Sequence, residues 1–425
     1  MKRTLVITLV TIAALSIWTV LVGVGAREGW VRAMPAAKGD MKGFLQWAES
    51  RYTAESKGNI AIMLLDRGRV AKTYFNSHGR TVDADSIFQV ASLSKWLTAW
   101  GVMTLVEQGR IDLDAPVERY LTRWHLPPSE FNNDDVTIRR LLSHTAGLTD
   151  DLGFLGFGPE EKLPSIEQEL SHTSDVLPGA SGIVRVGARP SSTWRYSGGG
   201  YLILQLLIEE VTQESFNDYM LHAVFEPLGM SASTFVDPDA NHLADFYAPD
   251  GSPATHYWFT ATGAASLYTS AADLTRFLEA HLGSPDAPPG RGVLSPETLS
   301  LMHAPQAFLF GLPVWGLGMS LYAPNDAGSF VIGHDGSNYP AINTTARIDP
   351  VTGNGLIVLS TGNATLAREI GGEWLYWQRG TVGLDTIVLF DLGRILMLFA
   401  GGALVIVTSA ILIGRRRREK ISKLP

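Results

Sequence analysis

Two long uncharged segments, one near each end of the chain, constrain where everything between them can lie. Thr4 to Ala26 follows the basic start MKR, and Ile395 to Gly414 is followed at once by four arginines at 415–418. Each segment is long enough to cross a bilayer as a helix. Because lysine and arginine are retained on the cytoplasmic side, both ends are expected inside and the intervening chain outside. The sequence therefore predicts a lipid bilayer as a partner and an extracytoplasmic domain on the plasma (inner) membrane.

Both segments leave an alternative open. Residues 24–26, VGA, resemble a small-residue cleavage site, so residues 1–26 are either an uncleaved signal anchor or a signal peptide. For 395–414 the alternative is a buried helix of a soluble fold, against which the following arginines argue. The expected order is a folded domain at 40–380, a linker at 381–394, a transmembrane helix at 395–414 and a basic cytoplasmic tail at 415–425.

Composition excludes several kinds of chemistry. The chain has no cysteine, so it has no disulfide, no thiol nucleophile and no thiolate metal site. It also lacks His-Glu-x-x-His and Gly-x-Ser-x-Gly sequences, which argues against a zinc hydrolase and an α/β-hydrolase. The net charge is −8, and no basic aromatic patch is present, so we expect no nucleic-acid partner. We expect no metal and no other cofactor.

The sequence SLSK at 92–95 opens an apolar segment that continues to Gln108. A pattern that is apolar on nearly every face predicts a buried helix, and burial lowers the pKa of a lysine. Residues three apart share a helix face, so Lys95 can reach the Ser92 hydroxyl. An amine beside a hydroxyl can activate a serine nucleophile without histidine. A serine cap beside a lysine that reaches solvent is the alternative for this tetrapeptide taken alone.

Residues 88–99, FQVASLSKWLTA, resemble the active-site segment of the serine β-lactamase and penicillin-binding protein superfamily, which carries an S-x-x-K motif. VTIRRLLSHTAGL at 136–148, FEPLGM at 225–230 and AADL at 271–274 are similar to further segments of one branch. That branch contains class C β-lactamases, D-amino-acid peptidases and carboxylesterases. The resemblance implies a mixed α/β fold, with an antiparallel sheet flanked by helices beside an all-α lobe.

The residue pattern predicts a similar arrangement. Two β-rich runs, 59–65 and 70–75, are joined by a turn and indicate a hairpin. Helical patterns dominate 113–235, interrupted by a long Gly/Pro/Ser-rich stretch at 149–190. Further predicted elements are helices at 201–211 and 273–281, a surface loop at 284–292, and strands around 315–322, 330–334, 341–348 and 356–360. We expect one sheet built from both ends of this region, with a helical lobe inserted between.

The resemblance implies a second part of the site at Tyr196, in WRYSGGGY at 194–201. The family has a Tyr-x-Asn motif here, whose tyrosine and the motif lysine together move the serine proton. Gly198 stands where the family has asparagine, so an amide-binding side chain is missing. We expect the nearby ammonium to lower the pKa of Tyr196. Taken alone, a tyrosine before a helix is usually a packing residue.

The third part is His334-Asp335-Gly336, where β-lactamases carry Lys-Thr-Gly. The resemblance places an oxyanion hole at the backbone N–H groups of Ser92 and Ser337. We expect Asp335 to keep the His334 imidazole protonated, with a structural histidine as the alternative. The residues expected to bind substrate are His334, Asp335, Gly336, Ser197 and Asn338.

His144 follows Ser143, and such a pair raises the possibility of a Ser-His-Asp triad. The surrounding LLSHTAG at 141–147 instead resembles a structural turn of the helical lobe, so we assign His144 no catalytic role.

The sequence thus predicts a membrane-anchored serine hydrolase that forms an acyl-enzyme on Ser92, with Lys95 and Tyr196 also catalytic. The substrate is a small molecule or peptide with an amide or ester bond. An amide or peptide, including one with a D-residue, is favoured over a simple ester, and efficient β-lactam hydrolysis comes third because two motif side chains are replaced. Carboxylesterase, weak β-lactamase and peptidase therefore stay open. The non-enzyme alternative is a penicillin-binding sensor or an envelope scaffold.

Overall fold

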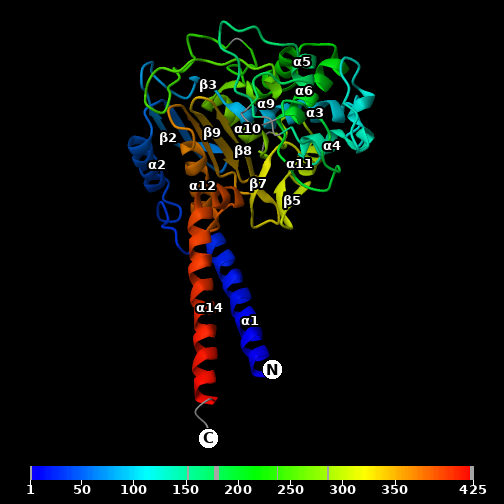
Figure 1. Ribbon diagram of the computed structural model, residues 1–425. Coiled ribbons are helices and arrows are strands. Elements are labelled where there is room, and N and C mark those ends of the chain that lie inside the picture. The colour runs from blue at the N-terminus through cyan, green and yellow to red at the C-terminus, as the bar shows by residue number, and fades with distance from the viewer. Residues whose placement is uncertain (1, 151–152, 177–180, 237, 285–286, 422–425) are drawn as a thin grey trace. The chain divides into compact units, whose positions relative to one another are not determined.

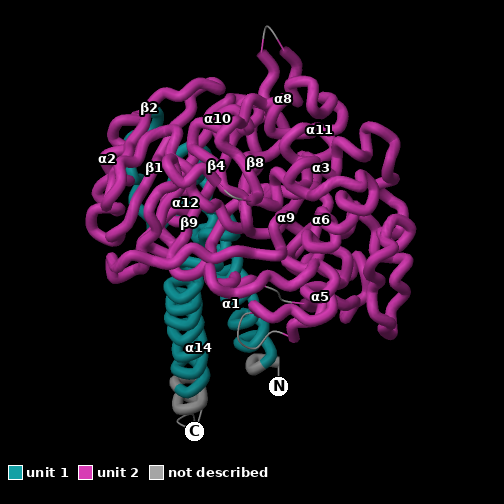
Figure 2. The backbone as a smooth tube through the Cα atoms, turned by 90° about the horizontal axis from the view of Figure 1, so that it is seen from above, with its two compact units in different colours: residues 1–39, 372–425 teal, residues 40–371 magenta. Residues whose placement is uncertain are grey.

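The structure is a computed structural model that describes residues 2–150, 153–176, 181–236, 238–284 and 287–421 (Figure 1). The chain forms two compact units, coloured separately in Figure 2. The terminal unit combines Met1–Gly39 with Gly372–Pro425, and the larger unit is Asp40–Gly371. The boundary near 371 falls inside helix α12 (Leu366–Arg379). The domain bounds expected at 40–380 stay a prediction.

An eight-stranded antiparallel sheet runs through the larger unit in the order β2-β1-β10-β9-β8-β7-β6-β5. In chain order its strands are β1 Ile60–Asp66, β2 Arg69–Asn76, β5 Ala307–Leu309, β6 Leu312–Trp315, β7 Ser320–Pro324, β8 Phe330–Asn338, β9 Ile342–Ile348 and β10 Gly355–Ser360. β1 pairs with β10, with Ile60 opposite Ser360, so distant parts of the chain meet in one sheet. This confirms the prediction of a sheet assembled from both ends.

The central strands are covered on both faces. β1, β9 and β10 are buried almost throughout, whereas β2 at one edge is mostly exposed. Strands buried on both sides need other elements packed over each face of the sheet. α10 (Ala271–Ala280) packs against β1, β9 and β10, while α2 (Met41–Glu55) packs against β2. The antiparallel sheet with flanking helices is the predicted mixed α/β fold.

A helical lobe adjoins the sheet within the larger unit (Figure 1). Its two longest helices, α3 (Ser94–Glu107) and α6 (Gly198–Thr212), contact each other and also α9 (Thr262–Ala265). The shorter helices and turns of this unit are η1 Ala91–Leu93, η2 Val117–Arg119, η3 Asn133–Asp135, α4 Ile138–Leu142, α5 Ile166–Ser171, α7 Phe216–Met220, η4 Leu221–Phe225, α8 Glu226–Leu228 and α11 Pro296–His303. A second small sheet pairs β3 (Ile87–Gln89) with β4 (Tyr268–Ser270), just before the turn that holds Ser92.

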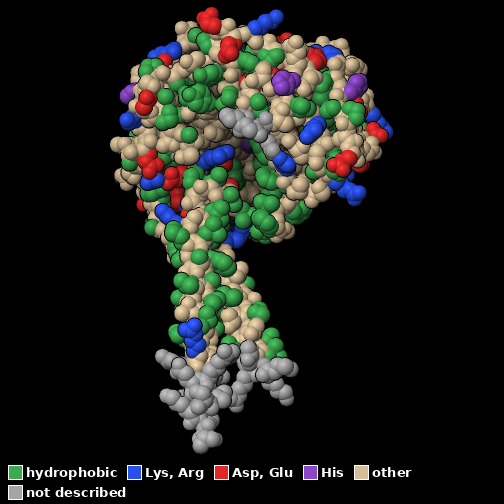
Figure 3. Space-filling view, in the orientation of Figure 1, with side chains coloured by type: hydrophobic (Ala, Val, Ile, Leu, Met, Phe, Trp, Pro, Cys, Tyr) green, Lys and Arg blue, Asp and Glu red, His purple; other side chains and the backbone are tan. Residues whose placement is uncertain are grey.

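The terminal unit contains two helices, Leu5–Arg27 and Leu384–Arg415, that are long and apolar enough to cross a membrane. Figure 3 shows hydrophobic side chains along both. They correspond to α1 Lys2–Arg27 and to the continuous run of α13 Leu384–Thr386, η5 Ile387–Asp391 and α14 Leu392–Ile421. The residues expected to be a linker, 381–394, are thus helical from Leu384, because their apolar side chains continue the following helix. Residues 422–425 of the expected tail lie outside the described residues.

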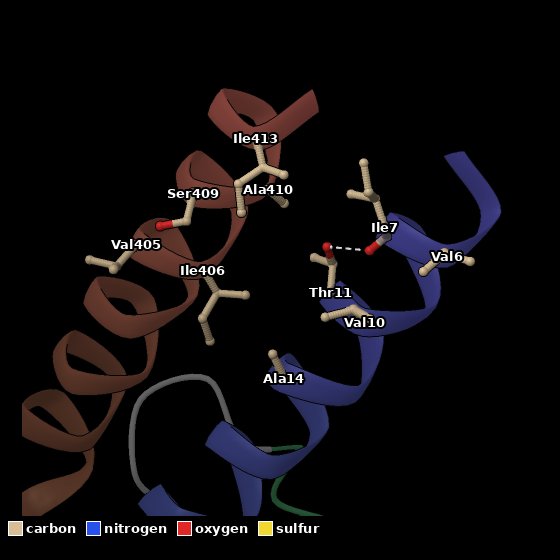
Figure 4. A pocket seen from close by; sticks show the side chains of 10 residues that line it. All are labelled: Val6, Ile7, Val10, Thr11, Ala14, Val405, Ile406, Ser409, Ala410 and Ile413. Carbon is tan, nitrogen blue, oxygen red and sulfur yellow. Dashed lines mark hydrogen bonds between the residues drawn. The ribbon is translucent and has the colours of Figure 1, made fainter. Parts of the chain in front are cut away.

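Contacts within the terminal unit hold α1 beside α14. The Trp18 indole N–H donates to the carbonyl of Phe399 at 3.1 Å. Gly402 makes room for that ring, because a Cβ at this position would lie 2.1 Å from it. Small residues commonly allow membrane helices to approach in this way. Elsewhere between the helices there is an apolar groove of about 430 Å³, whose lining includes Val10, Ala14 and Ile406 (Figure 4).

Candidate active site

Ser92 lies in the short turn η1, and α3 begins two residues later at Ser94. The turn is fixed by Ser94, whose hydroxyl donates to the carbonyl of Ala91 at 2.5 Å and accepts from the N–H of Leu267 at 2.9 Å. Ala91 has a φ of +52°, which residues other than glycine rarely adopt. Such strain persists only where the surroundings impose it, and it is common at functional sites.

Lys95 is 2% exposed and faces Ser92 across one helical turn, as its spacing predicts. Its Nζ donates to Ser92 Oγ at 3.2 Å and to the carbonyl of Ala264 at 2.7 Å. Burial lowers the pKa of Lys95 to about 7, and the negative charge of Asp150 opposes part of that shift. The amine is therefore uncharged in a large share of molecules near neutral pH, in a position to accept a proton from Ser92.

Tyr196 completes a cluster with these two residues. Lys95 Nζ lies 5.1 Å from the centre of the Tyr196 ring, and the phenol hydrogen-bonds Ser92. The pKa of Tyr196 is raised by burial, although the bond to Ser92 opposes the change. The expectation of a lowered pKa is therefore wrong, because removing a phenolate from water raises the pKa by more than the hydrogen bond to Ser92 and the charge of Arg368 lower it. The phenol is neutral in the resting site.

His144 packs directly against this tyrosine, with ring centres 4.4 Å apart. Its Nδ1 accepts a hydrogen bond from the backbone N–H of Ser197 at 3.1 Å. Burial, together with the charges of Lys95 and His334, moves the pKa of His144 well below its usual value. Ser143 is bonded elsewhere, to the carbonyl of Arg139 at 2.8 Å, so the two residues form no triad. The sequence identified the structural turn but gave no sign that it supports Tyr196.

Asp150 and Ser197 hold the start of α6, the helix that follows Tyr196. Ser197 is the N-cap: its hydroxyl accepts from Gly200 N–H at 2.9 Å and donates to Asp150 at 2.7 Å. The other carboxylate oxygen of Asp150 accepts from Gly199 N–H at 2.9 Å. The buried Ser197 hydroxyl is thus engaged by the helix terminus, and the substrate contact expected of Ser197 stays a prediction. Sequence reasoning missed Asp150, since only the fold brings it to this helix.

On β8, His334 and Asp335 point to opposite faces of the sheet, as successive strand residues do. Asp335 forms an ion pair with Arg347, Oδ2 to Nη2, at 3.1 Å, and accepts from the Thr345 hydroxyl at 2.6 Å. His334 Nδ1 lies 2.6 Å from the Asp335 carbonyl, so this nitrogen carries the proton. Burial lowers the pKa of His334 to about 3, and the charge of Lys95 adds to the shift. The prediction of a protonated imidazole is therefore wrong.

Gly336 allows β8 to approach the turn before Ser92. A Cβ at this position would lie 2.1 Å from the carbonyl oxygen of Val90, so no other residue fits without movement. The next residue, Ser337, is exposed, and β8 contacts η1, the turn that contains Ser92. Asn338 uses its amide within the protein, donating to Gln89 Oε1 at 3.3 Å and to the Ala265 carbonyl at 3.2 Å. These bonds join β8 to β3 and to the C-terminal end of α9, and the expected role of Asn338 as a substrate contact stays a prediction.

Among the described residues, no group of three or more histidine, aspartate or glutamate side chains could hold a metal ion. The chemistry of this cluster is that of an amine, two hydroxyls and nearby backbone N–H groups. Such groups support nucleophilic acyl transfer.

Comparison with known proteins agrees with this arrangement. A family model described as Beta-lactamase matches residues 46–380. The chain is 29% identical to penicillin-binding protein 4 of Amycolatopsis lactamdurans, over 69% of this chain and 79% of that protein.

Two solved structures share the fold. One is the octameric penicillin-binding protein homologue from Pyrococcus abyssi, with a TM-score of 0.63, 22% identity, and coverage of 80% of this chain and 79% of that one. The other is the D-amino acid amidase from Ochrobactrum anthropi, with a TM-score of 0.61, 21% identity, and coverage of 80% and 98%. The chain therefore belongs to the β-lactamase family, in the class C-like branch, and is a serine hydrolase of that family.

Proposed function

We propose that this protein is a membrane-anchored acyl hydrolase that cleaves amide or peptide bonds through an acyl-enzyme on Ser92. The observation that carries the proposal is the buried Lys95 amine, 3.2 Å from Ser92 Oγ and with a pKa of about 7. A general base works best when its pKa lies near the operating pH. Lys95 meets that requirement without a histidine or a metal.

In the proposed reaction, the Ser92 hydroxyl gives its proton to Lys95 as Oγ attacks the substrate carbonyl carbon. The N–H groups of Ser92 and Ser337 stabilise the oxyanion, a contribution worth ~10²–10³ in rate for each donor. Collapse of the intermediate breaks the bond to the leaving amine, which takes a proton from the Tyr196 phenol, and Lys95 returns one to the phenolate. Water then cleaves the acyl-enzyme by the same steps in reverse order.

Two features favour an uncharged amide over a penicillin or cephalosporin. His334 is neutral where β-lactamases carry a lysine, so this position offers no cation to the carboxylate of a β-lactam. Gly198 lacks the side chain amide of the family motif. The shared fold with a D-amino acid amidase is in keeping with an amide substrate. An ester, whose leaving group needs less protonation, is the second substrate class to test.

The direct experiment labels the full chain with a fluorophosphonate and maps the modified peptide. We expect one adduct, on Ser92, that disappears in Ser92→Ala and persists in the matched control Ser143→Ala. A panel of D-aminoacyl amides, aryl esters and a cephalosporin then ranks the substrates. An adduct elsewhere would overturn the mechanism, turnover of esters alone would change the substrate class, and labelling without turnover of any substrate would indicate a penicillin-binding sensor.

The membrane part of the proposal places residues 5–27 and 384–415 across the plasma membrane with the larger unit outside. Protease added to intact cells should cut the predicted surface loop 284–292 and spare Lys420 near the basic end. A protected loop or a digested tail would mean the opposite orientation. Release of a chain cut after Thr381 from the membrane would indicate that residues 1–26 are a cleaved signal peptide.

A further inference from the structure

A hairpin at one edge of the large sheet has an exposed apolar tip, and we propose that this tip docks on a lipid bilayer. The hairpin consists of β5, β6 and the two residues between them (Figure 1). The apolar tip is Phe310, Phe308 and Leu312, which are 89%, 54% and 40% exposed. The inference rests on the proposed membrane anchoring and adds a second contact, made by the larger unit itself.

The apex holds Phe310 in an unfavourable backbone conformation. Leu309 pairs with Leu312, so the loop has two residues, and φ is +52° at Phe310 and +78° at Gly311. Two positive φ values are typical of a type I′ turn, in which asparagine or aspartate followed by glycine is preferred. A bulky side chain rarely adopts such a φ. Phe310 is thus both strained and exposed, and packing in the core explains neither its backbone strain nor its exposure.

The surroundings of the tip suit a low-dielectric phase. From Thr298 to Asn325 the sequence contains no Asp, Glu, Lys or Arg. Taking a charge out of water is expensive, so a charged hairpin would resist contact with lipid. This one meets no such penalty, and burial of its aromatic and aliphatic side chains is favourable.

A bilayer is the occupant favoured by the chain itself, because short segments tether the larger unit to both apolar helices. The first apolar helix ends at Arg27 and the unit begins at Asp40; the unit ends at Gly371 and the second apolar helix begins at Leu384. A segment of about a dozen residues spans at most about 40 Å when fully extended. Such tethering raises the effective concentration of one surface at the other.

The same hairpin also reaches the candidate active site. Trp315 at the end of β6 is buried, with its ring centre 5.3 Å from that of His334 and 5.8 Å from that of Tyr196. A docked tip would therefore hold the reacting groups close to the membrane surface. Substrates that reside in the bilayer by an apolar chain would then be favoured over freely soluble ones.

The absence of cysteine allows a site-specific test in the full chain. Phe310→Cys, carrying a bimane label, is reconstituted in phosphatidylcholine vesicles that contain doxyl-labelled lipid. We expect loss of bimane fluorescence comparable to that of Leu404→Cys on α14. Lys72→Cys, exposed on β2 at the opposite edge of the sheet, should keep its fluorescence.

The outcomes separate docking from anchoring. Quenching at position 404 but not at 310 would overturn docking and leave the anchor intact, whereas quenching at neither position would overturn the anchor. Equal quenching at 310 and 72 would mean unselective contact. A label at 310 that is shielded from water and yet not quenched by the doxyl-labelled lipid would indicate contact with a second protein copy. The last two results also overturn docking.

A substitution tests the consequence for activity. Phe310→Asn suits the turn, so it should raise the melting temperature while removing the apolar contact. We expect an unchanged rate on a soluble short-chain substrate and a lower rate on a long-chain substrate held in vesicles. An unchanged rate on both would contradict the proposed link between tip and substrate.

Discussion

Helix α3 and strand β8 form two walls of the candidate site, and each wall carries one buried basic residue whose pKa is lowered to a different value. Lys95, at the start of α3, keeps a pKa of about 7, while His334, on β8, has a pKa of about 3. Burial lowers both, but Lys95 has the negative charge of Asp150 nearby. Asp335 also raises the pKa of His334, but that carboxylate is paired with Arg347 and its effect is smaller than those of burial and the Lys95 charge. The α3 wall can therefore exchange protons near neutral pH, whereas the β8 wall supplies a neutral surface.

The contrast between the two walls depends on Lys95 acting as the general base that deprotonates Ser92. Lys95→Ala should slow acylation by ~10²–10⁴-fold, the usual contribution of general base catalysis. Fluorophosphonate labelling followed over time measures the rate, and circular dichroism checks that the fold is kept. Lys72→Ala, which alters an exposed lysine of β2, should leave the rate unchanged. A near-normal rate in Lys95→Ala would remove that lysine from the mechanism.

Restoring a cation on the β8 wall would sharpen the comparison. His334→Lys should raise acylation by a penicillin, relative to an uncharged amide, by about 10–100-fold, since a hydrogen bond to a charged group contributes ~1.5–3 kcal/mol. The ratio of the two acylation rates gives the effect, and His334→Gln serves as the uncharged control. If both variants leave the ratio unchanged, His334 has only a structural role.

The pH profile compares the two walls directly. Because the neutral amine is the active form of Lys95, acylation should rise with pH and level off above about 7. Below that value the rate should fall by about tenfold per pH unit, as expected for one titrating base. His334→Gln should leave this acid limb of the pH profile unchanged, because the imidazole is already neutral throughout this pH range. A limb displaced in that variant would mean that His334 titrates near pH 7.

The smallest effect is expected for the carboxylate that supports Lys95. Its negative charge raises the pKa of Lys95, so Asp150→Asn should lower that pKa and move the acid limb to lower pH. The variant should also lose ~1–3 kcal/mol of stability, because Asp150 accepts hydrogen bonds at the start of α6. Melting curves and the pH profile measure the two effects separately. A limb that moves to higher pH would contradict the electrostatic account.

Local patterns were sufficient for much of the fold and for part of the site. The spacing of Ser92 and Lys95 predicted their contact because a helix fixes which residues share a face. The runs at 59–65 and 356–360 predicted strands, and the resemblance to family motifs located Tyr196. Side chains alternate between the two faces of a strand, so the sequence of β8 also indicates that His334 and Asp335 point apart. This alternation argues against the prediction that Asp335 keeps His334 protonated.

Other features depend on tertiary structure. The raised pKa of Tyr196 comes from burial, which no local pattern reveals. Asp150 and His144 reach the site only because the chain folds their segments against Tyr196 and the start of α6. The hydroxyl of Ser197 looked available because the capping of α6 depends on where that helix begins.

The pairing of β1 with β10 has a consequence for biosynthesis. During synthesis β1 leaves the ribosome long before its partner, and Ile60 must wait for Ser360. Closing so long a loop is slow, and unpaired apolar strand edges favour aggregation meanwhile. The helical lobe, encoded between them, can form first from local contacts. The sheet is complete only after β10 has been synthesised, shortly before the C-terminal apolar helix. A chain exported during translation would therefore finish folding only as that helix enters the translocon.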